Sequence, residues 1–117
     1  DAELLGGLGR LYLRLGRWPE AVELYDEAHR LHPRDAQVCN NLGVAYLQQG
    51  QSAAARDWFA RAVDLSPKYA RAWANLGEAH KALGDTKAAR RAWEQALAAD
   101  PQEERARRAL RALGEGR

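Results

Sequence analysis

Residues 73–101 read WANLGEAHKALGDTKAARRAWEQALAADP, and the same framework of small and apolar residues stands 34 positions earlier, in residues 39–67. The framework recurs a third time near the start of the chain. The positions that carry an identical residue in all three copies are Ala2/Ala36/Ala70, Leu8/Leu42/Leu76, Gly9/Gly43/Gly77, Gly16/Gly50/Gly84, Ala21/Ala55/Ala89, Ala28/Ala62/Ala96 and Pro33/Pro67/Pro101. A fixed period of this length predicts an array of one supersecondary unit, whose copies stack to bury a continuous core. Such arrays bind partners along an extended surface.

Each unit is predicted to hold two helices separated by a glycine. Within the second unit, apolar residues recur at helical spacing on both sides of Gly50, which stands where a helix end needs a left-handed residue. We expect Asp35 and Ser52 to cap the two helices of this unit. The expected helices are residues 2–15, 18–31, 36–49, 52–65, 70–83, 86–99 and 103–113, the last of them covering the end of the stack.

Small residues inside these helices indicate close packing. A glycine inside a helix costs about 1 kcal/mol relative to alanine, so its recurrence at Gly9, Gly43 and Gly77 implies that another helix approaches there. We expect the second helix of the same unit to make this approach through its repeated alanines. The large residues at one register of the second helices are expected to fill the gaps between units; they are Tyr25, Phe59 and Trp93.

Composition excludes several classes of protein. The chain has 117 residues and a formal net charge of +2, which is too small to suggest a nucleic-acid partner. No apolar run approaches the ~18 residues of a membrane span, and no signal peptide is visible. Methionine is absent, so we expect a segment of a longer protein, and localisation is not predicted. Basic residues gather near the end, at Arg105, Arg107, Arg108, Arg111 and Arg117.

The repeated residues resemble the signature of the tetratricopeptide repeat, W-x2-L-G-x2-Y…A-x3-F…P. The third unit matches it with Trp73, Leu76-Gly77, Ala89, Trp93 and Pro101, and His80 replaces its tyrosine. The first two units depart from it by placing Leu5 and Cys39 at the tryptophan position. The resemblance implies an all-α fold, a right-handed superhelical array of antiparallel helix pairs (an α-solenoid). We expect one domain over residues 1–117, with repeats at 2–35, 36–69 and 70–103 and a capping helix at 104–113.

The chain offers little for catalysis, and we expect neither an enzyme nor a cofactor. Cys39 and His80 stand where the repeat requires packing residues. His29 and His32 are spaced for a shared metal, but no third ligand joins them, and histidine is also favourable near a helix C-terminus. The glycines of residues 6–9 lack the strand and lysine of a phosphate loop.

The resemblance places a concave groove along the first helices of the units. Projecting the face opposite the packing stripe gives the candidate peptide-binding residues, namely Arg10, Arg14, Gln37, Asn40, Asn41, Val44, Gln48, Arg71, Asn75, Glu78 and Lys81. Arg105 and Arg108 are further candidates. Because arginine and lysine outnumber Glu3 and Glu78 in this projection, we expect an acidic or carboxylate-ended partner.

Asn41 and Asn75 share one register, directly before Leu-Gly. Asparagine is unfavourable inside helices, so its repetition invites a specific reason. One interpretation is a ladder of amides that grips the backbone of an extended peptide, similar to the asparagine ladder of longer tetratricopeptide superhelices. The alternative is that each amide bonds to its own stack.

A second family feature, the dicarboxylate clamp for acidic C-terminal tails, is matched in part. Asn41 and Arg71 fall on its positions. Gly6 and Arg10 stand where the clamp has lysine and asparagine, and Asn75 stands where it has arginine. The sequence thus predicts a non-enzymatic scaffold that binds an extended peptide or protein segment in its groove. The alternatives are a self-association module and a targeting domain of a larger enzyme or complex.

Overall fold

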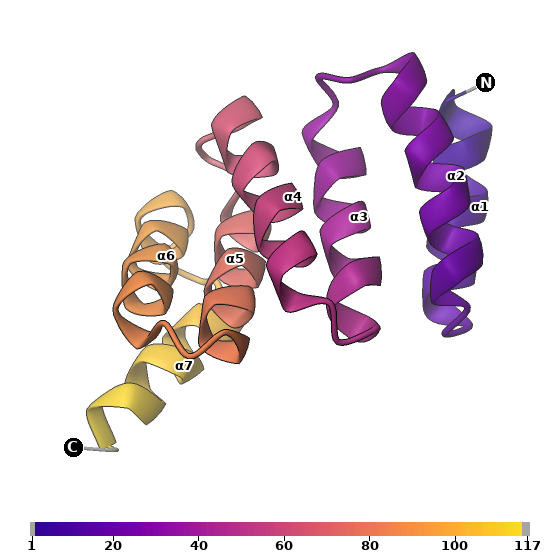
Figure 1. The fold of residues 1–117 in the computed structure, drawn as a ribbon. Helices are drawn as coiled ribbons and strands as arrows, with labels where there is room; N and C mark the ends of the chain where they lie inside the picture. Colours follow the sequence, from indigo (N-terminus) through magenta and orange to yellow (C-terminus); the bar gives the residue numbers. More distant parts are fainter. Residues whose placement is uncertain (1, 116–117) are drawn as a thin grey trace.

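The 34-residue period corresponds to three antiparallel helix pairs followed by a single helix (Figure 1). This computed structural model describes residues 2–115, so Arg117 lies outside the described residues. All regular elements of this part of the chain are α-helices, which confirms the predicted fold class. The first helices of the pairs are α1 (Ala2–Arg14), α3 (Ala36–Gln48) and α5 (Ala70–Ala82). The second helices are α2 (Trp18–Leu31), α4 (Ser52–Leu65) and α6 (Thr86–Ala99), and α7 (Glu104–Glu115) follows.

The turn inside each pair is made by a glycine with positive φ, as predicted. The φ angles are 73° at Gly16, 78° at Gly50 and 81° at Gly84, a region that side chains rarely enter. The residue after each glycine donates its N–H to a carbonyl five residues back, as Gln51 does to Tyr46 at 3.0 Å. The first helices therefore end one residue earlier than predicted, because the turn begins before the glycine.

The helix caps confirm one sequence prediction and correct another. The Asp35 carboxylate accepts hydrogen bonds from the N–H groups of Gln37 and Val38 at the start of α3. The predicted cap at Ser52 is wrong, since Ser52 is the first helical residue of α4 and no side chain bonds at that cap. Asp85 does cap α6, accepting from Ala88 at 3.1 Å.

The glycines inside the first helices admit an aromatic ring from the second helix of the same pair. A Cβ built at Gly9 would lie 2.6 Å from the Tyr25 ring, and a Cβ at Gly77 would lie 2.5 Å from Cδ1 of Trp93. Gly43 stands in the same relation to Phe59. The close approach of the second helix of the same unit was predicted correctly. The contacting residue differs from the expectation, since an aromatic ring and not an alanine lies over each glycine. The expectation that these three rings only fill the gaps between units is therefore wrong.

The first unit differs from the second by the buried hydroxyl of Tyr25, since Phe59 holds the same position, and the effect of this hydroxyl on stability can be tested. The hydroxyl is buried without a hydrogen-bond partner among the described residues, and burial raises the pKa of Tyr25 to about 12. The unfolded state then ionises at lower pH than the folded state, so stability is full below pH ~10 and is lost as pH rises toward ~12. Tyr25→Phe, which copies the residue of the second unit, is expected to raise the free energy of unfolding by ~1 kcal/mol at pH 7. Denaturant unfolding at several pH values checks this; identical profiles for the variant and its parent would contradict it.

The curvature of the stack follows from which helices touch. Each first helix contacts the next first helix, and α5 also contacts α7. The second helices pack closely against first helices, and α2 and α4 meet only through long side chains, where the His29 ring contacts Trp58. The first helices therefore form the inner layer, and the groove predicted from the sequence lies along this layer.

No helix in the described part of the chain combines the length and apolar character that crossing a membrane requires.

Candidate peptide-binding groove

The inner layer carries a hollow of about 580 Å³ between α3, α5 and the start of α7, which we call the central groove. Its lining residues are Asn40, Asn41, Val44, Leu47, Gln48, Arg71, Asn75, Glu78, Glu103 and Arg105. Most of the predicted binding residues of the second and third units are thus brought together in one place. Lys81, although exposed on α5, lines none of the hollows described in this section.

The predicted residues of the first unit line two smaller hollows. Arg10 and Gln37 lie in a hollow of about 320 Å³ between α1 and α3, which Asn41 also lines. Arg14 lines a hollow beside it, together with Arg10 and Gly7. Because Asn41 belongs to both the central groove and the first of these hollows, the two form a continuous path along the inner layer.

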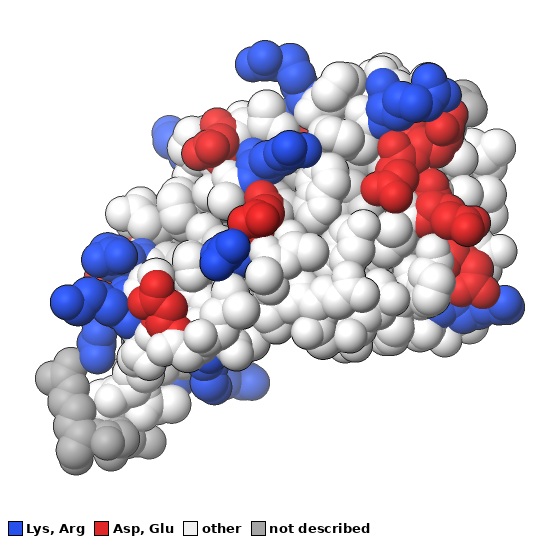
Figure 2. Space-filling model, viewed as in Figure 1, with Lys and Arg blue, Asp and Glu red and all other residues white. Residues whose placement is uncertain are grey.

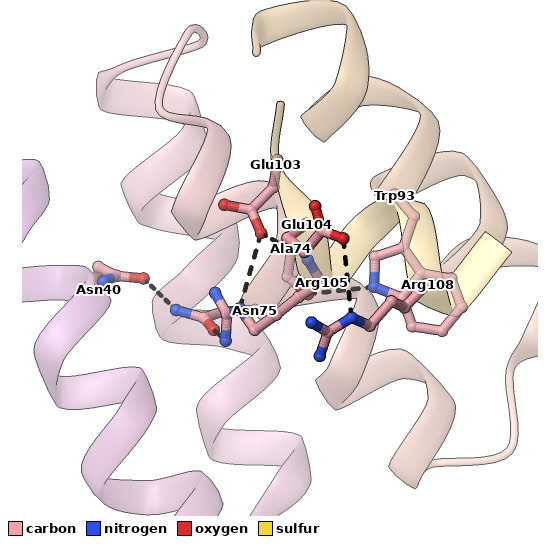
Figure 3. Close-up of polar contacts among 8 residues, drawn as sticks. All are labelled: Asn40, Ala74, Asn75, Trp93, Glu103, Glu104, Arg105 and Arg108. Atoms are coloured by element: carbon pink, nitrogen blue, oxygen red, sulfur yellow. Dashed lines mark hydrogen bonds and ion pairs between the residues drawn. The ribbon is translucent and has the colours of Figure 1, made fainter. Parts of the chain in front are cut away.

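Asn75 is held within the protein rather than facing the groove freely. Its Nδ2 donates to Oδ1 of Asn40 at 2.9 Å, and its Oδ1 accepts from a terminal guanidinium nitrogen of Arg105 at 2.9 Å (Figure 3). Asn40 and Asn75 are only 2% and 4% exposed. Of the two interpretations of the asparagine pair, this favours a residue that bonds to its own stack. Asn41, one repeat earlier, is half-buried and lines the groove.

Arg105 is oriented by this chain of amides. Its guanidinium donates to the Asn75 amide oxygen on one side and forms an ion pair with Glu103 on the other, with Nε 3.7 Å from Oε1. The same Glu103 oxygen accepts the backbone N–H of Arg105 at 3.1 Å. The Arg105 side chain remains 48% exposed while that of Glu103 is 15% exposed. The cation is therefore the more accessible member of the pair.

The charge of the central groove is more balanced than predicted. Arg71 and Arg105 face Glu78 and Glu103, and the projection from the sequence omitted Glu103. The basic side chains of the groove are nevertheless more exposed to solvent than the acidic ones. Arg71 is exposed, whereas Glu78 is half-buried and Glu103 is engaged with α7. A ligand entering the groove thus meets guanidinium groups first.

Sequence reasoning missed two lining residues, and one candidate lies elsewhere. Glu103 belongs to the connection before α7, and its position depends on where α7 packs, so no repeat signal could reveal it. Leu47 was not in the projected face. Arg108 is not among the lining residues of the central groove and pairs with Glu104 on its own helix (Figure 3).

The residues considered for chemistry occupy structural positions. Cys39 is fully buried, and burial raises the pKa of its thiol, which disfavours the nucleophilic thiolate. His80 is half-buried, and desolvation lowers its pKa. The His29 ring packs edge-on against Trp58, with the ring centres 4.9 Å apart. In the described chain no three His, Cys, Asp or Glu residues are grouped as metal ligands. Residues 6–9 lie inside α1.

Comparison with known proteins agrees with this architecture. Two sequence models described as tetratricopeptide repeat match residues 7–70 and 46–113. No curated protein matches the sequence significantly.

Solved structures are similar over almost the whole chain. The first tetratricopeptide domain of Spaghetti (RPAP3), bound to the HSP90 peptide SRMEEVD, is 26% identical with a TM-score of 0.94, covering 99% of this chain and 92% of that one. The Sgt2 domain from Aspergillus fumigatus is also 26% identical with a TM-score of 0.94, covering 98% and 78%. The OM64 domain from Arabidopsis is 25% identical with a TM-score of 0.95, covering 99% and 96%.

The repeated signature, the helix pairs and these matches give one answer. We conclude that the chain belongs to the tetratricopeptide repeat family, whose domains are non-enzymatic scaffolds for protein interaction.

Proposed function

We propose that this domain, comprising repeats 2–35, 36–69 and 70–103 with the helix that follows, binds the acidic C-terminal end of an extended peptide in its central groove. The observation that carries the proposal is the pairing of two accessible guanidinium groups, Arg71 and Arg105, around one hollow. Guanidinium groups bind carboxylates in bidentate fashion, and these hydrogen bonds are about twice as strong as neutral ones.

The similar domain from Spaghetti supports this ligand class, because it was solved with the peptide SRMEEVD, which carries acidic residues at its end. In the present chain Asn41 and Arg71 match the dicarboxylate clamp, and Asn75 replaces the arginine of that clamp. We propose that Arg105 supplies the missing guanidinium from α7, since the amide of Asn75 holds it at the same end of the groove. Asn75 is then a positioning residue, and Asn41 is the amide that contacts the ligand.

The groove also sets the length of the bound segment. First helices pack about 10 Å apart, which is close to three extended residues at ~3.3 Å each. A peptide of five to seven residues would therefore run from the Arg105 end past Asn41 toward Arg10 and Gln37, which line the next hollow.

Calorimetric titration tests the proposal with SRMEEVD as the free acid and as the C-terminal amide. We expect a Kd of about 10–100 µM for the acid, and Arg71→Gln or Arg105→Gln is expected to weaken it about tenfold through loss of ~1.4 kcal/mol. Arg108→Gln is the matched control, because it removes the same charge from the same helix outside the groove, and we expect less than a twofold change.

Two results would contradict the proposal. One is that neither the acid nor the amide binds at millimolar concentration. The other is that Arg105→Gln and Arg108→Gln weaken binding of the acid equally. Equal weakening would mean that Arg105 acts only through the net charge of the domain. Self-association, the alternative raised by the sequence, would use a different surface and does not compete with this groove.

A further inference from the structure

Four leucines stand exposed in a single stripe along α1, at the opposite end of the stack from α7. Leu4 is 63% exposed, Leu8 40%, Leu11 41% and Leu15 61%. Their spacing of four, three and four residues places them on one face of a helix. Leu15 directly follows α1, and its N–H still donates to the Leu11 carbonyl at 3.0 Å, so the stripe is continuous. We call these four residues the α1 leucine stripe.

The equivalent faces of the other first helices are covered. One repeat later, Val38, Leu42 and Ala45 are at most 7% exposed and form one buried cluster with residues of α2. Two repeats later, the corresponding face of α5 is buried in a cluster with α4. The α1 leucine stripe is therefore the same interface, and no other helix in the described residues covers it.

The composition of the stripe indicates what covers it. Where α3 and α5 have the fully buried alanines Ala45 and Ala79, α1 has Leu11. A helix that approached α1 as closely as α2 approaches α3 would meet this larger side chain. Leucines at four–three–four spacing instead pack into the gaps of a second leucine stripe of the same kind.

The other end of the stack does not match this surface. The outer face of α7 carries the exposed residues Arg107, Arg108 and Arg111, and Figure 2 shows basic side chains gathered at that end. Covering these guanidinium groups with leucine side chains would remove their hydration, and this cost disfavours head-to-tail stacking of the two ends. The complementary surface available on a copy of this chain is its own α1 leucine stripe.

We propose that two copies of this domain associate through their α1 leucine stripes, antiparallel and related by a twofold axis. Such an interface uses the same patch on both copies. The antiparallel arrangement also brings the acidic first turn of one α1, with Glu3, toward the basic last turn of the other, with Arg14. Second helices and the central groove stay accessible, so the inference stands independently of the proposed ligand.

Sedimentation equilibrium of the domain between 5 µM and 1 mM tests this directly. One helix face is smaller than a standard interface, so we expect a weak dimer with a Kd of about 100 µM. The double variant Leu4→Lys/Leu15→Lys changes the two most exposed members of the stripe and is expected to remain a monomer at 1 mM. Leu83→Lys is the control, because Leu83 holds the register of Leu15 at the end of α5 and is 41% exposed. It is expected to dimerise like the parent.

Circular dichroism establishes that the variants keep the helical fold. A lower molecular mass in sedimentation equilibrium then reports a loss of association and not unfolding. A monomeric parent at 1 mM overturns the proposal, and so does a dimer that survives the double substitution. Addition of a synthetic peptide of residues 52–65, the helix that covers the equivalent face of α5, distinguishes another occupant. If that peptide binds the stripe and the parent does not dimerise, the surface takes a repeat-type helix rather than a second copy.

Discussion

Gly77→Ala is expected to lower the free energy of unfolding by about 3 kcal/mol, although alanine is intrinsically the better helix former by ~1 kcal/mol. The added Cβ would lie 2.5 Å from Cδ1 and 2.7 Å from Cε2 of Trp93. The indole is 1% exposed and donates its N–H to the Ala74 carbonyl, so it has no space into which to move. Either α5 and α6 separate or the ring leaves its site, and both options expose buried surface.

Gly7→Ala provides the matched control for this change. Gly7 also lies within a first helix, but nothing stands within 4 Å of the position that a Cβ would take there. Alanine at this position should raise the free energy of unfolding by about 0.5–1 kcal/mol through helix propensity alone. Guanidinium denaturation of both variants measures the two effects. Shifts of the same sign would mean that close packing does not explain the glycine inside the repeat.

Trp93→Ala is expected to cost about 4 kcal/mol, within the range for removing a large buried aromatic side chain. The ring is among the largest fully buried side chains and lies in one cluster with Ala106 of α7. Its loss also leaves the Ala74 carbonyl without the indole hydrogen bond. Because α5, α6 and α7 all lose contacts, we expect the C-terminal end of the stack to unfold first.

A double-mutant cycle ties the two effects together. With Trp93 already replaced by alanine, the clash at Gly77 is gone, and Gly77→Ala is expected to become neutral or stabilising. Denaturation of the four proteins in the cycle gives the coupling energy, and hydrogen exchange locates the unfolded end. Additive costs in the double variant would show that the ring and the glycine do not contact each other.

Much of the fold could be predicted because each residue that a turn or a close contact requires recurs at the same position in all three repeats. Gly16, Gly50 and Gly84 share a register, and a turn with positive φ is the requirement that glycine alone meets without strain. The internal glycines likewise predicted a close approach. The cap predicted at Ser52 was wrong, because a hydroxyl near a helix start signals that a helix begins nearby without fixing its first residue.

The hydrogen-bond network of Asn40, Asn75 and Arg105 in the central groove could not be predicted from the 34-residue repeat. Asn41 and Asn75 share a register, yet Asn75 bonds to Asn40, whose own equivalents are Gly6 and Ala74. Asn40 and Asn75 belong to different repeats and occupy different positions within them, so the 34-residue period does not indicate that they pair. Arg105 completes the network from α7, outside the repeats, and its contact depends on how that helix packs.

The sequence suggested an uncapped N-terminal end but did not identify the residues of the α1 leucine stripe, for a different reason. Leu8 occupies the same signature position as Leu42 and Leu76, both of which are buried, so the sequence pattern assigns it to the core. Burial depends on the presence of a preceding helix, and the motif itself does not encode this. Leu8 therefore differs from Leu42 and Leu76 in exposure among the described residues while matching them in sequence.

The central claim, that the inner layer binds an acidic-ended peptide, is tested most directly by NMR. Amide and side-chain shifts of 15N-labelled protein would be followed during titration with SRMEEVD. The proposal predicts that the side-chain amides of Asn40 and Asn41 and the backbone near Arg71 and Arg105 shift most, with α2 and α4 nearly unchanged. Shifts confined to the outer helices, or none at a millimolar excess of peptide, would contradict it.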